Sequence, residues 1–247
     1  MFSFFKKKEK ISAITVTNFA PITVDMHSHV LPGIDDGAQT PADSIILIKK
    51  MLELGITKII ATPHIMADYY KNNAETINAS LAILREALAT ENMTIDIAAA
   101  AEHYFDETFE TLINNGQLMT MGQKYVLFEL PFIGAPPNLL PQIKRMRDLG
   151  YKPILAHPER YTYLKLDDLK GIKNYGCKLQ LNTISLTGYY GKQVKKAAEE
   201  LAENGMVDFI SSDMHHLRHA DALEKALQVP MVQQLIDSKL LQNNVLL

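Results

Sequence analysis

Short apolar or β-branched runs alternate along the chain with longer segments in which apolar residues recur every three or four positions. The first pattern is typical of buried strands, and the second is typical of amphipathic helices. The predicted strands are Ile22–Met26, Lys58–Ala61, Ile95–Ala100, Tyr125–Leu130, Pro153–Ala156, Lys178–Leu181 and Val207–Ser211. The predicted helices are Pro41–Leu54, Ala74–Thr90, Glu107–Asn114, Leu139–Leu149, Leu166–Tyr175, Lys192–Asn204 and Ala220–Leu227. This order is that of repeated strand–helix units.

The residues at the helix ends agree with this assignment. Thr40 before Pro41 is typical of an N-cap followed by proline at the first helical position. Glycines stand where predicted helices should end, at Gly55, Gly116, Gly150, Gly176 and Gly205. Parallel strands with helices outside predict an α/β fold, and seven strands favour a barrel similar to the TIM barrel with one strand fewer. An open, doubly wound sheet is the alternative.

Length and composition bound the class of protein. A chain of 247 residues with 47% hydrophobic residues can bury one large core, so we expect a single domain over residues 21–247 after a solvated tail of residues 1–20. No apolar run approaches the roughly 20 residues that cross a bilayer, which predicts no stable membrane insertion. The start MFSFFKKKEK lacks the features of a signal peptide, which predicts a cytoplasmic protein. A net charge of -3 without a basic stripe argues against nucleic-acid binding.

Cys177 is the only cysteine of the sequence. It therefore cannot form an intrachain disulfide or a cysteine-based zinc site. A cysteine-dependent tyrosine phosphatase needs a His-Cys pair with an arginine six residues later, but Gly176 precedes Cys177 and Thr183 occupies the sixth position. We therefore expect Cys177 to be buried and to pack among apolar side chains rather than to act as a nucleophile.

Imidazole and carboxylate groups follow nearly every predicted strand. His27 and His29 come at the end of the first strand, where the alternation of side chains puts them on one face and Ser28 on the other. The polar groups that follow the later strands are His64, Glu102, His103, Glu129, His157, Asn182, Asp213 and His215. Because the carboxyl ends of the strands of a β/α barrel meet on one face, these side chains are predicted to share one pocket.

This set of donors is typical of a metal site. The nine candidate ligands are His27, His29, Asp36, His64, Glu102, Glu129, His157, Asp213 and His215. Nine donors are too many for one ion that keeps a position open for water, so two or three ions are expected. Nitrogen and oxygen ligands without sulfur suit manganese, iron or zinc. The remaining histidines nearby, His216 and His219, are expected to be surface residues.

Six short segments of the chain resemble one known family. They are DMHSHVLPGIDDG at 25–37, TPH at 62–64, AEHYFD at 101–106, FELP at 128–131, AHPERY at 156–161 and SSDMHH at 211–216. In this order they resemble the bacterial capsular polysaccharide biosynthesis protein-tyrosine phosphatases of the CpsB/CapC type, which belong to the polymerase and histidinol phosphatase (PHP) superfamily. The resemblance covers about residues 23–230. It implies a distorted seven-stranded, TIM-like barrel, in agreement with the strand count reached from the pattern.

The resemblance also implies roles for single residues. It implies three Mn²⁺ ions, the first held by His27, His29, Glu102 and Asp213, the second by Glu102, Glu129 and His157, and the third by Asp36, His64 and His215. Asp35 is then left to cap its loop. Arg160, in the segment HPER, is implied to bind the phosphoryl group. Arg218 is the nearest match to a second arginine of the family, at a shorter spacing from the SDMH segment.

The implied activity is that of a manganese-dependent protein-tyrosine phosphatase. A water activated by the ions would attack phosphorus, and the phenolate, whose conjugate acid has a pKa near 10, would leave with little help. The implied substrate is a phosphotyrosine protein, an autophosphorylating bacterial tyrosine kinase that controls capsule or exopolysaccharide synthesis.

Three alternatives remain open at this point. A related PHP phosphoesterase could act on a small phosphomonoester such as histidinol phosphate with the same site chemistry. An amidohydrolase is disfavoured because many of these enzymes carry a carboxylated lysine after the fourth strand, where this chain has Glu129. A non-catalytic metal-binding scaffold of the polysaccharide machinery is disfavoured by the full ligand set and by Arg160.

Overall fold

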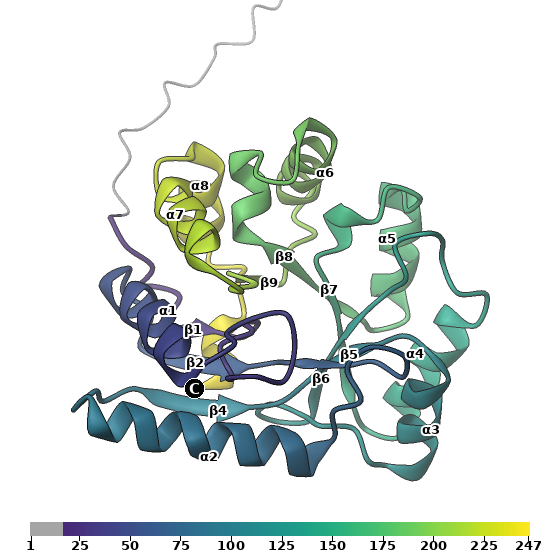
Figure 1. Cartoon of the computed structure of the whole chain (residues 1–247). Helices are drawn as coiled ribbons and strands as arrows, with labels where there is room; N and C mark the ends of the chain where they lie inside the picture. The colour runs from purple at the N-terminus through teal and green to yellow at the C-terminus, as the bar shows by residue number, and fades with distance from the viewer. Residues whose placement is uncertain (1–16) are drawn as a thin grey trace, which may run out of the picture.

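The computed structural model describes residues 17–247, and its strands are all parallel (Figure 1). The smaller sheet has the order β1-β2-β4, with β1 (Val24–Asp25), β2 (Lys58–Ala61) and β4 (Asp96–Ala99). The larger sheet contains, in spatial order, β3 (His64–Ile65), β5 (Glu102–Tyr104), β6 (Tyr125–Glu129), β7 (Lys152–Ala156), β8 (Lys178–Asn182) and β9 (Phe209–Ser211). All seven predicted strands are present, with bounds that differ by two residues or fewer. The α/β class with parallel strands is therefore confirmed.

The two additional strands, β3 and β5, continue β2 and β4 after a short interruption. Pro63 stands between β2 and β3, and proline has no amide hydrogen to donate to a strand ladder. Across the interruption, the Ala100 amide donates to the Ala61 carbonyl (2.8 Å), and the Glu102 amide donates to the Pro63 carbonyl (3.1 Å). The ladder therefore passes from the smaller sheet to the larger one at this point, which the hydrophobic pattern did not predict.

The first and last strands lie side by side without forming a regular ladder. A single parallel bridge joins Ser28 to Met214, and the Asp213 amide donates to the His27 carbonyl at 2.9 Å. Within residues 17–247 the strands thus form two sheets, so the hydrogen bonds do not close the predicted seven-stranded barrel. The interruption at Pro63 and the short β1 explain this difference, because each removes rungs from the ladder.

The seven predicted helices are all present. They are α1 (Pro41–Glu53), α2 (Ala74–Thr90), α3 (Glu107–Asn115), α4 (Leu139–Asp148), α5 (Leu166–Asn174), α6 (Lys192–Glu203) and α7 (Leu217–Ala226). The structure adds α8 (Pro230–Asp237) and three 3₁₀ turns, η1 (Pro158–Arg160), η2 (Thr183–Thr187) and η3 (Asn243–Leu246). The Thr40 N-cap is confirmed, because its hydroxyl accepts from the Asp43 amide at 3.2 Å while Asp43 accepts from the Thr40 amide at 3.0 Å.

The predicted tail falls mostly on residues 1–16, which lie outside the described residues. Phe19, also placed in that tail, is 3% exposed, and its amide donates to the Leu54 carbonyl at 2.7 Å. The packed part of the chain therefore begins before residue 21. Among residues 17–247, no helix combines the length and the apolar character needed to cross a membrane.

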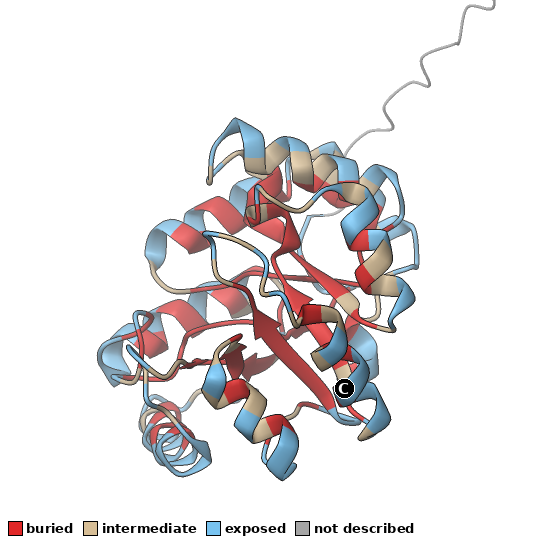
Figure 2. Cartoon of the chain, turned by 90° about the vertical axis from the view of Figure 1, so that its right-hand side faces the viewer, coloured by how far each residue is buried: buried red, intermediate tan, exposed pale blue. Residues whose placement is uncertain are grey.

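Both faces of the strands are buried, while the helices expose their outer faces to solvent (Figure 2). Strand β6 shows how this is achieved, because its successive side chains belong to two separate apolar clusters. Leu127 packs in an inner cluster with residues of β1, β2, β7 and β9, whereas Val126 and Phe128 pack outward against the helices. This two-sided burial explains why the strands read as continuous apolar runs.

Candidate metal centre

His27 and His29 follow β1 and point to the same side, as the alternation of side chains predicted. Their Nε2 atoms lie 3.3 Å apart. The Nδ1 atom of His27 lies 2.9 Å from the Gln180 Oε1, and the Nδ1 atom of His29 lies 2.7 Å from the Asp35 Oδ2. Because each Nδ1–H donates to an oxygen, each Nε2 can present its lone pair to a cation.

All nine predicted ligands converge in one place, as the strand-end argument anticipated. They form four overlapping groups in which the ligand atoms lie within 4.8 Å of one another. The groups are His29–Asp36–His64–His215, His27–His29–Asp213, His27–Glu102–His157 and His64–Glu102–Glu129. These groups overlap the three ligand sets that the family resemblance implies, but they are not identical to them. His29, implied for the first ion, also lies in the group that contains Asp36, and Glu129, implied for the second ion, lies beside His64 of the third.

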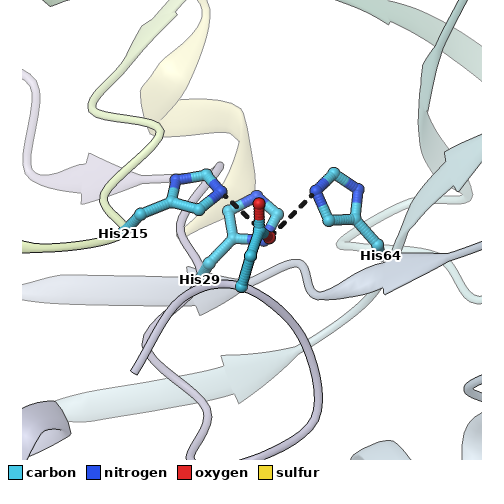
Figure 3. Close-up of side chains that lie close together, drawn as sticks. His29, His64 and His215 are labelled. Carbon is cyan, nitrogen blue, oxygen red and sulfur yellow. Dashed lines mark ion pairs between the residues drawn. The ribbon is translucent and has the colours of Figure 1, made fainter. Parts of the chain in front are cut away.

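One group joins Asp36 to His29, His64 and His215, the three histidines labelled in Figure 3. The Asp36 Oδ1 lies 3.5 Å from the Nε2 of His64 and 3.5 Å from the Nε2 of His215, and these ion pairs are the dashed lines of Figure 3. His215 also stacks on His29, with ring centroids 3.9 Å apart. The hydrogen bond from His215 lowers the pKa of Asp36 and outweighs burial, so the carboxylate is ionised and available to a cation.

Glu102 lies at the centre of the cluster, completely buried. Its Oε2 lies 3.2 Å from the His27 Nε2, 3.4 Å from the His29 Nε2 and 3.2 Å from the His64 Nδ1, yet no group within residues 17–247 donates a hydrogen bond to it in acceptable geometry. Burial alone would raise the pKa of Glu102, but His27 and His64 hold it well below its usual range. A buried carboxylate oxygen without a donor, among three imidazoles, fits coordination of a divalent ion.

The charges in this cluster also fit metal binding. Burial lowers the pKa of His27, but the carboxylates of Glu102 and Asp213 outweigh it and raise the pKa to about 9. The carboxylates thus attract positive charge strongly enough to hold a proton on a buried imidazole. A divalent ion supplies that charge instead and requires neutral imidazoles, so its binding must release protons.

Two of the predicted ligands have backbone conformations that are rare for residues other than glycine. His157, directly after β7, has φ 32°, and Asp213, shortly after β9, has φ 52°. Such conformations cost on the order of 1–3 kcal/mol each and cluster at functional sites. A neighbouring side chain contacts the backbone of Asp213, since the His219 Nδ1 lies 2.9 Å from the Asp213 carbonyl oxygen. His219 is only 6% exposed, so its prediction as a surface residue was wrong.

Asp35 and Gln180 orient the histidine ligands, and sequence reasoning missed this role. Asp35 caps its loop as expected, because it accepts from the Gly37 amide at 3.0 Å, but its other oxygen contacts His29. Gln180 lies in the middle of β8 and is fully buried. A glutamine between Leu179 and Leu181 in an apolar strand was the signal that could have identified it.

Gly37 allows the ligand loop to close against His29. A Cβ at Gly37 would lie 2.0 Å from the His29 carbonyl oxygen and 2.5 Å from the His29 Cβ. Replacing Gly37 with alanine should therefore displace His29, lower the free energy of unfolding by about 1–3 kcal/mol and reduce the bound metal. Thermal denaturation and metal analysis measure both effects. The matched control is Gly134→Ala, because a Cβ at Gly134 meets nothing within 4 Å. Equal metal content in the two variants would contradict the prediction.

The predicted phosphoryl-binding residue Arg160 lies over the pocket in η1. Its Nη1 lies 3.2 Å from the Asp213 Oδ2, and its guanidinium carbon lies 4.9 Å from the Phe132 ring centroid and 4.7 Å from that of Tyr190. Arg160 is thus held between two aromatic faces beside the ligand cluster. Arg218 does not line this pocket but lies in a neighbouring cavity.

The metal pocket has a volume of about 480 Å³ and an aromatic mouth. Seven of the nine predicted ligands and Arg160 line its base, whereas His27 and His29 are completely buried and do not line it. The aromatic residues at its mouth are Tyr69, Tyr70, Tyr104, Phe132 and Tyr190. Tyr70 stacks on His64, and Phe132 stacks on His157. The two other polar residues expected at strand ends do not line the pocket. Asn182 donates to Asp213 at 2.9 Å, and His103 packs on Phe109.

The chain resembles known proteins over most of its length. Tyrosine-protein phosphatase YwqE of Bacillus subtilis (strain 168) is 31% identical over 198 residues, covering 79% of this chain and 78% of that protein. Putative tyrosine-protein phosphatase CapC of Staphylococcus aureus is 28% identical over 207 residues, covering 83% of this chain and 81% of that protein.

One solved structure supports the same relationship. It comes from a study of YwqE from Bacillus subtilis and CpsB from Streptococcus pneumoniae, described as metal-dependent tyrosine phosphatases, and it matches with a TM-score of 0.74 at 28% identity, covering 89% of this chain and 95% of that chain. The family model described as capsular polysaccharide synthesis, CpsB/CapC, matches residues 23–243. The chain therefore belongs to the CpsB/CapC family of capsular polysaccharide synthesis proteins.

Proposed function

We propose that this protein is a metal-dependent protein-tyrosine phosphatase. The observation that carries the proposal is the buried Glu102 oxygen, which has no hydrogen-bond donor and is surrounded by the imidazoles of His27, His29 and His64. A protein that gathers this many nitrogen and oxygen ligands at the base of an open pocket can hold ions and admit a substrate. Its relatives are named as tyrosine-protein phosphatases.

The ions in this proposal are manganese, bound as two or three per chain. The nine side chains that would hold them are His27, His29, Asp36, His64, Glu102, Glu129, His157, Asp213 and His215. When bound, such ions polarise phosphoryl oxygens and lower the pKa of water from 15.7 to about 7. Asp35 and Gln180 keep His29 and His27 in the orientation that coordination needs.

Arg160 is the group of the chain itself that would contact the phosphoryl oxygens. Its planar guanidinium can donate to two oxygens at once, and Phe132 and Tyr190 hold that plane in place. The aromatic mouth would receive the phenyl ring of the substrate, and the phenolate, with a conjugate-acid pKa near 10, leaves without a strong general acid. The chain therefore needs no nucleophilic side chain.

The wider setting follows from the family. We infer a cytoplasmic protein that dephosphorylates an autophosphorylating tyrosine kinase of capsule or exopolysaccharide synthesis.

We also infer that the two sheets are parts of a distorted seven-stranded barrel. The Ser28–Met214 bridge and the inner apolar cluster formed by residues of β1, β2, β6, β7 and β9 support this inference.

A direct comparison of substrates tests the proposal. The protein loaded with Mn²⁺ should hydrolyse a phosphotyrosine peptide with a kcat/KM at least about 100-fold above that for histidinol phosphate. Only the peptide has a phenyl ring bonded directly to the phosphoryl oxygen, and only the peptide releases a phenolate rather than a more basic alkoxide. A preference for histidinol phosphate would identify a small-molecule phosphoesterase instead. Bound metal with no hydrolysis of either compound would indicate a scaffold.

Replacing Cys177 with serine is expected to change kcat/KM by less than about threefold. Cys177 is 1% exposed and does not line the metal pocket, and burial raises the pKa of its thiol, so no thiolate is available. Phosphatase assays on the purified variant measure the effect, with circular dichroism as a check on folding. Complete loss of activity in a folded variant, or a trapped phosphocysteine, would refute the metal-dependent mechanism.

A further inference from the structure

A second cavity of about 460 Å³ adjoins the metal pocket. Its walls are the loop that starts at Gly37, one face of α1 and the first residues of α7, two helices that pack against each other (Figure 1). His215 and His216 line both cavities, so the two cavities share a wall beside the metal ligands. We call this second cavity the flanking groove.

The flanking groove exposes apolar side chains beside the metal pocket. Ile46 of α1 is 44% exposed and Leu217 of α7 is 48% exposed, and both line the groove. Neighbouring Ala38 and Leu47 are buried at its base. Exposed apolar side chains that line a concave surface next to a reaction centre are typical of contacts with a partner or substrate.

The groove also contains an arginine whose charge is not compensated by a close carboxylate. Arg218 is exposed, and within residues 17–247 no carboxylate oxygen lies within 4.0 Å of its guanidinium nitrogens. Asp43 is the carboxylate that lines the groove, but it already accepts hydrogen bonds from the amide and the hydroxyl of Thr40. His215 and His216 bring no negative charge. The groove therefore offers a cation to an anionic group on a ligand.

We propose that the flanking groove binds the polypeptide next to the phosphotyrosine of a protein substrate. An apolar side chain of the substrate lies between Ile46 and Leu217, and an acidic side chain pairs with Arg218. The inference rests on the proposed function, because a phosphotyrosine in the metal pocket must continue into a polypeptide outside it. The shared wall at His215 and His216 makes the groove a path for that polypeptide, and Arg218 is then a substrate-binding residue rather than a ligand of the phosphoryl group.

The test is a charge exchange between Arg218 and the substrate. Two phosphotyrosine peptides are compared that differ only in carrying glutamate or lysine at the positions beside the tyrosine, and p-nitrophenyl phosphate serves as a small aryl phosphate. The wild-type protein loaded with Mn²⁺ should prefer the glutamate peptide by about tenfold in kcat/KM, and Arg218→Glu should reverse that preference. The matched control is Arg145→Glu, at an exposed position of α4 outside the groove, which should keep the wild-type preference.

The apolar part of the groove is tested in the same assay. The double variant Ile46→Ser and Leu217→Ser should lower kcat/KM for a peptide with a leucine beside the tyrosine by about tenfold relative to p-nitrophenyl phosphate. The control is Ile83→Ser, since Ile83 is 51% exposed on α2 and does not line the groove.

Each contrary result has a separate meaning. An unchanged peptide preference in Arg218→Glu would overturn the assignment of the groove. An equal loss on peptides and on p-nitrophenyl phosphate would also overturn it and would show that Arg218 contacts the phosphoryl group. If the wild-type protein hydrolyses no aryl phosphate with any divalent ion, the proposed function itself fails. If it hydrolyses all the peptides equally well, the proposed function stands and only the assignment of the groove fails.

Discussion

Removal of the divalent ions with excess chelator is expected to lower phosphotyrosine hydrolysis by roughly 1000-fold or more, and added Mn²⁺ is expected to restore it. The chain itself offers no substitute for the ions, because its single cysteine is buried away from the pocket. Ions that polarise the phosphoryl group and activate water contribute several kcal/mol to the transition state, and each 1.36 kcal/mol is a factor of ten in rate.

The same treatment is expected to lower the melting temperature. Glu102, Glu129 and Asp213 lie buried in one cluster, where the positive charge of the ions offsets their mutual repulsion. A ligand present at 100 times its dissociation constant stabilises the folded state by about 2.7 kcal/mol, which in a chain of this size corresponds to a shift of about 5–10 °C. Differential scanning calorimetry with and without Mn²⁺ measures the shift.

A chelator that has been saturated with Mn²⁺ beforehand is the control for effects of the chelator itself, and it should leave activity and melting temperature unchanged. Metal analysis of the treated protein shows whether the ions were removed. Full activity in a sample that contains no metal would contradict the proposed mechanism.

Replacing Arg160 with lysine is expected to lower kcat/KM for a phosphotyrosine peptide by roughly 10- to 1000-fold, or about 1.4–4 kcal/mol of transition-state stabilisation. The guanidinium plane lies between Phe132 and Tyr190, which orients its two donor edges. A lysine ammonium is a point charge that neither stacks between these two rings nor donates to two oxygens in a fixed geometry.

The side chain of Arg160 is 25% exposed, so it is more than a surface ion pair, for which the expected contribution is about 0–1 kcal/mol. Because Arg160 also contacts Asp213, metal content must be measured in the same preparation. The expected result is unchanged bound metal with a lower kcat/KM, and Arg145→Lys on the exposed face of α4 is the control. A near-normal kcat/KM would exclude phosphoryl binding by Arg160, whereas loss of metal together with activity would show that it holds the ligand cluster together.

The regular elements of the fold were largely predictable because their signals are local. A 13-residue helix such as α1 carries its own N-cap, proline and apolar face in the sequence, and its observed bounds agree with those expected. The strands of the sheets were predictable because burial on both faces requires continuous apolar runs. The short strands β3 and β5 and the eight-residue helix α8 were missed, since segments this short contain too few positions to show a period.

The residues of the site were predictable for a related reason. An imidazole or carboxylate directly after an apolar run is visible in the sequence, and parallel strands bring such positions to one edge. This argument predicted that His27 and Asp213, which are far apart in the chain, lie close together in the structure, and they do. It did not identify Gln180, which lies within β8 rather than at its end, or the buried His219, whose contact with the Asp213 carbonyl depends on the tertiary structure.

The sequence by itself determined the parallel α/β class, the donor types at the strand ends and the absence of a cysteine nucleophile, since each depends on residue identity and local order. Only the tertiary structure decided how the ligands group, which oxygens orient His27 and His29, and that Arg160 lies between two aromatic rings while Arg218 lies in a separate groove. The physical reason is that these features are distances and angles between side chains from different elements. These distances depend on the change from one sheet to the other at Pro63 and on the close approach of the loop to His29 at Gly37. Neither feature is encoded in a local pattern.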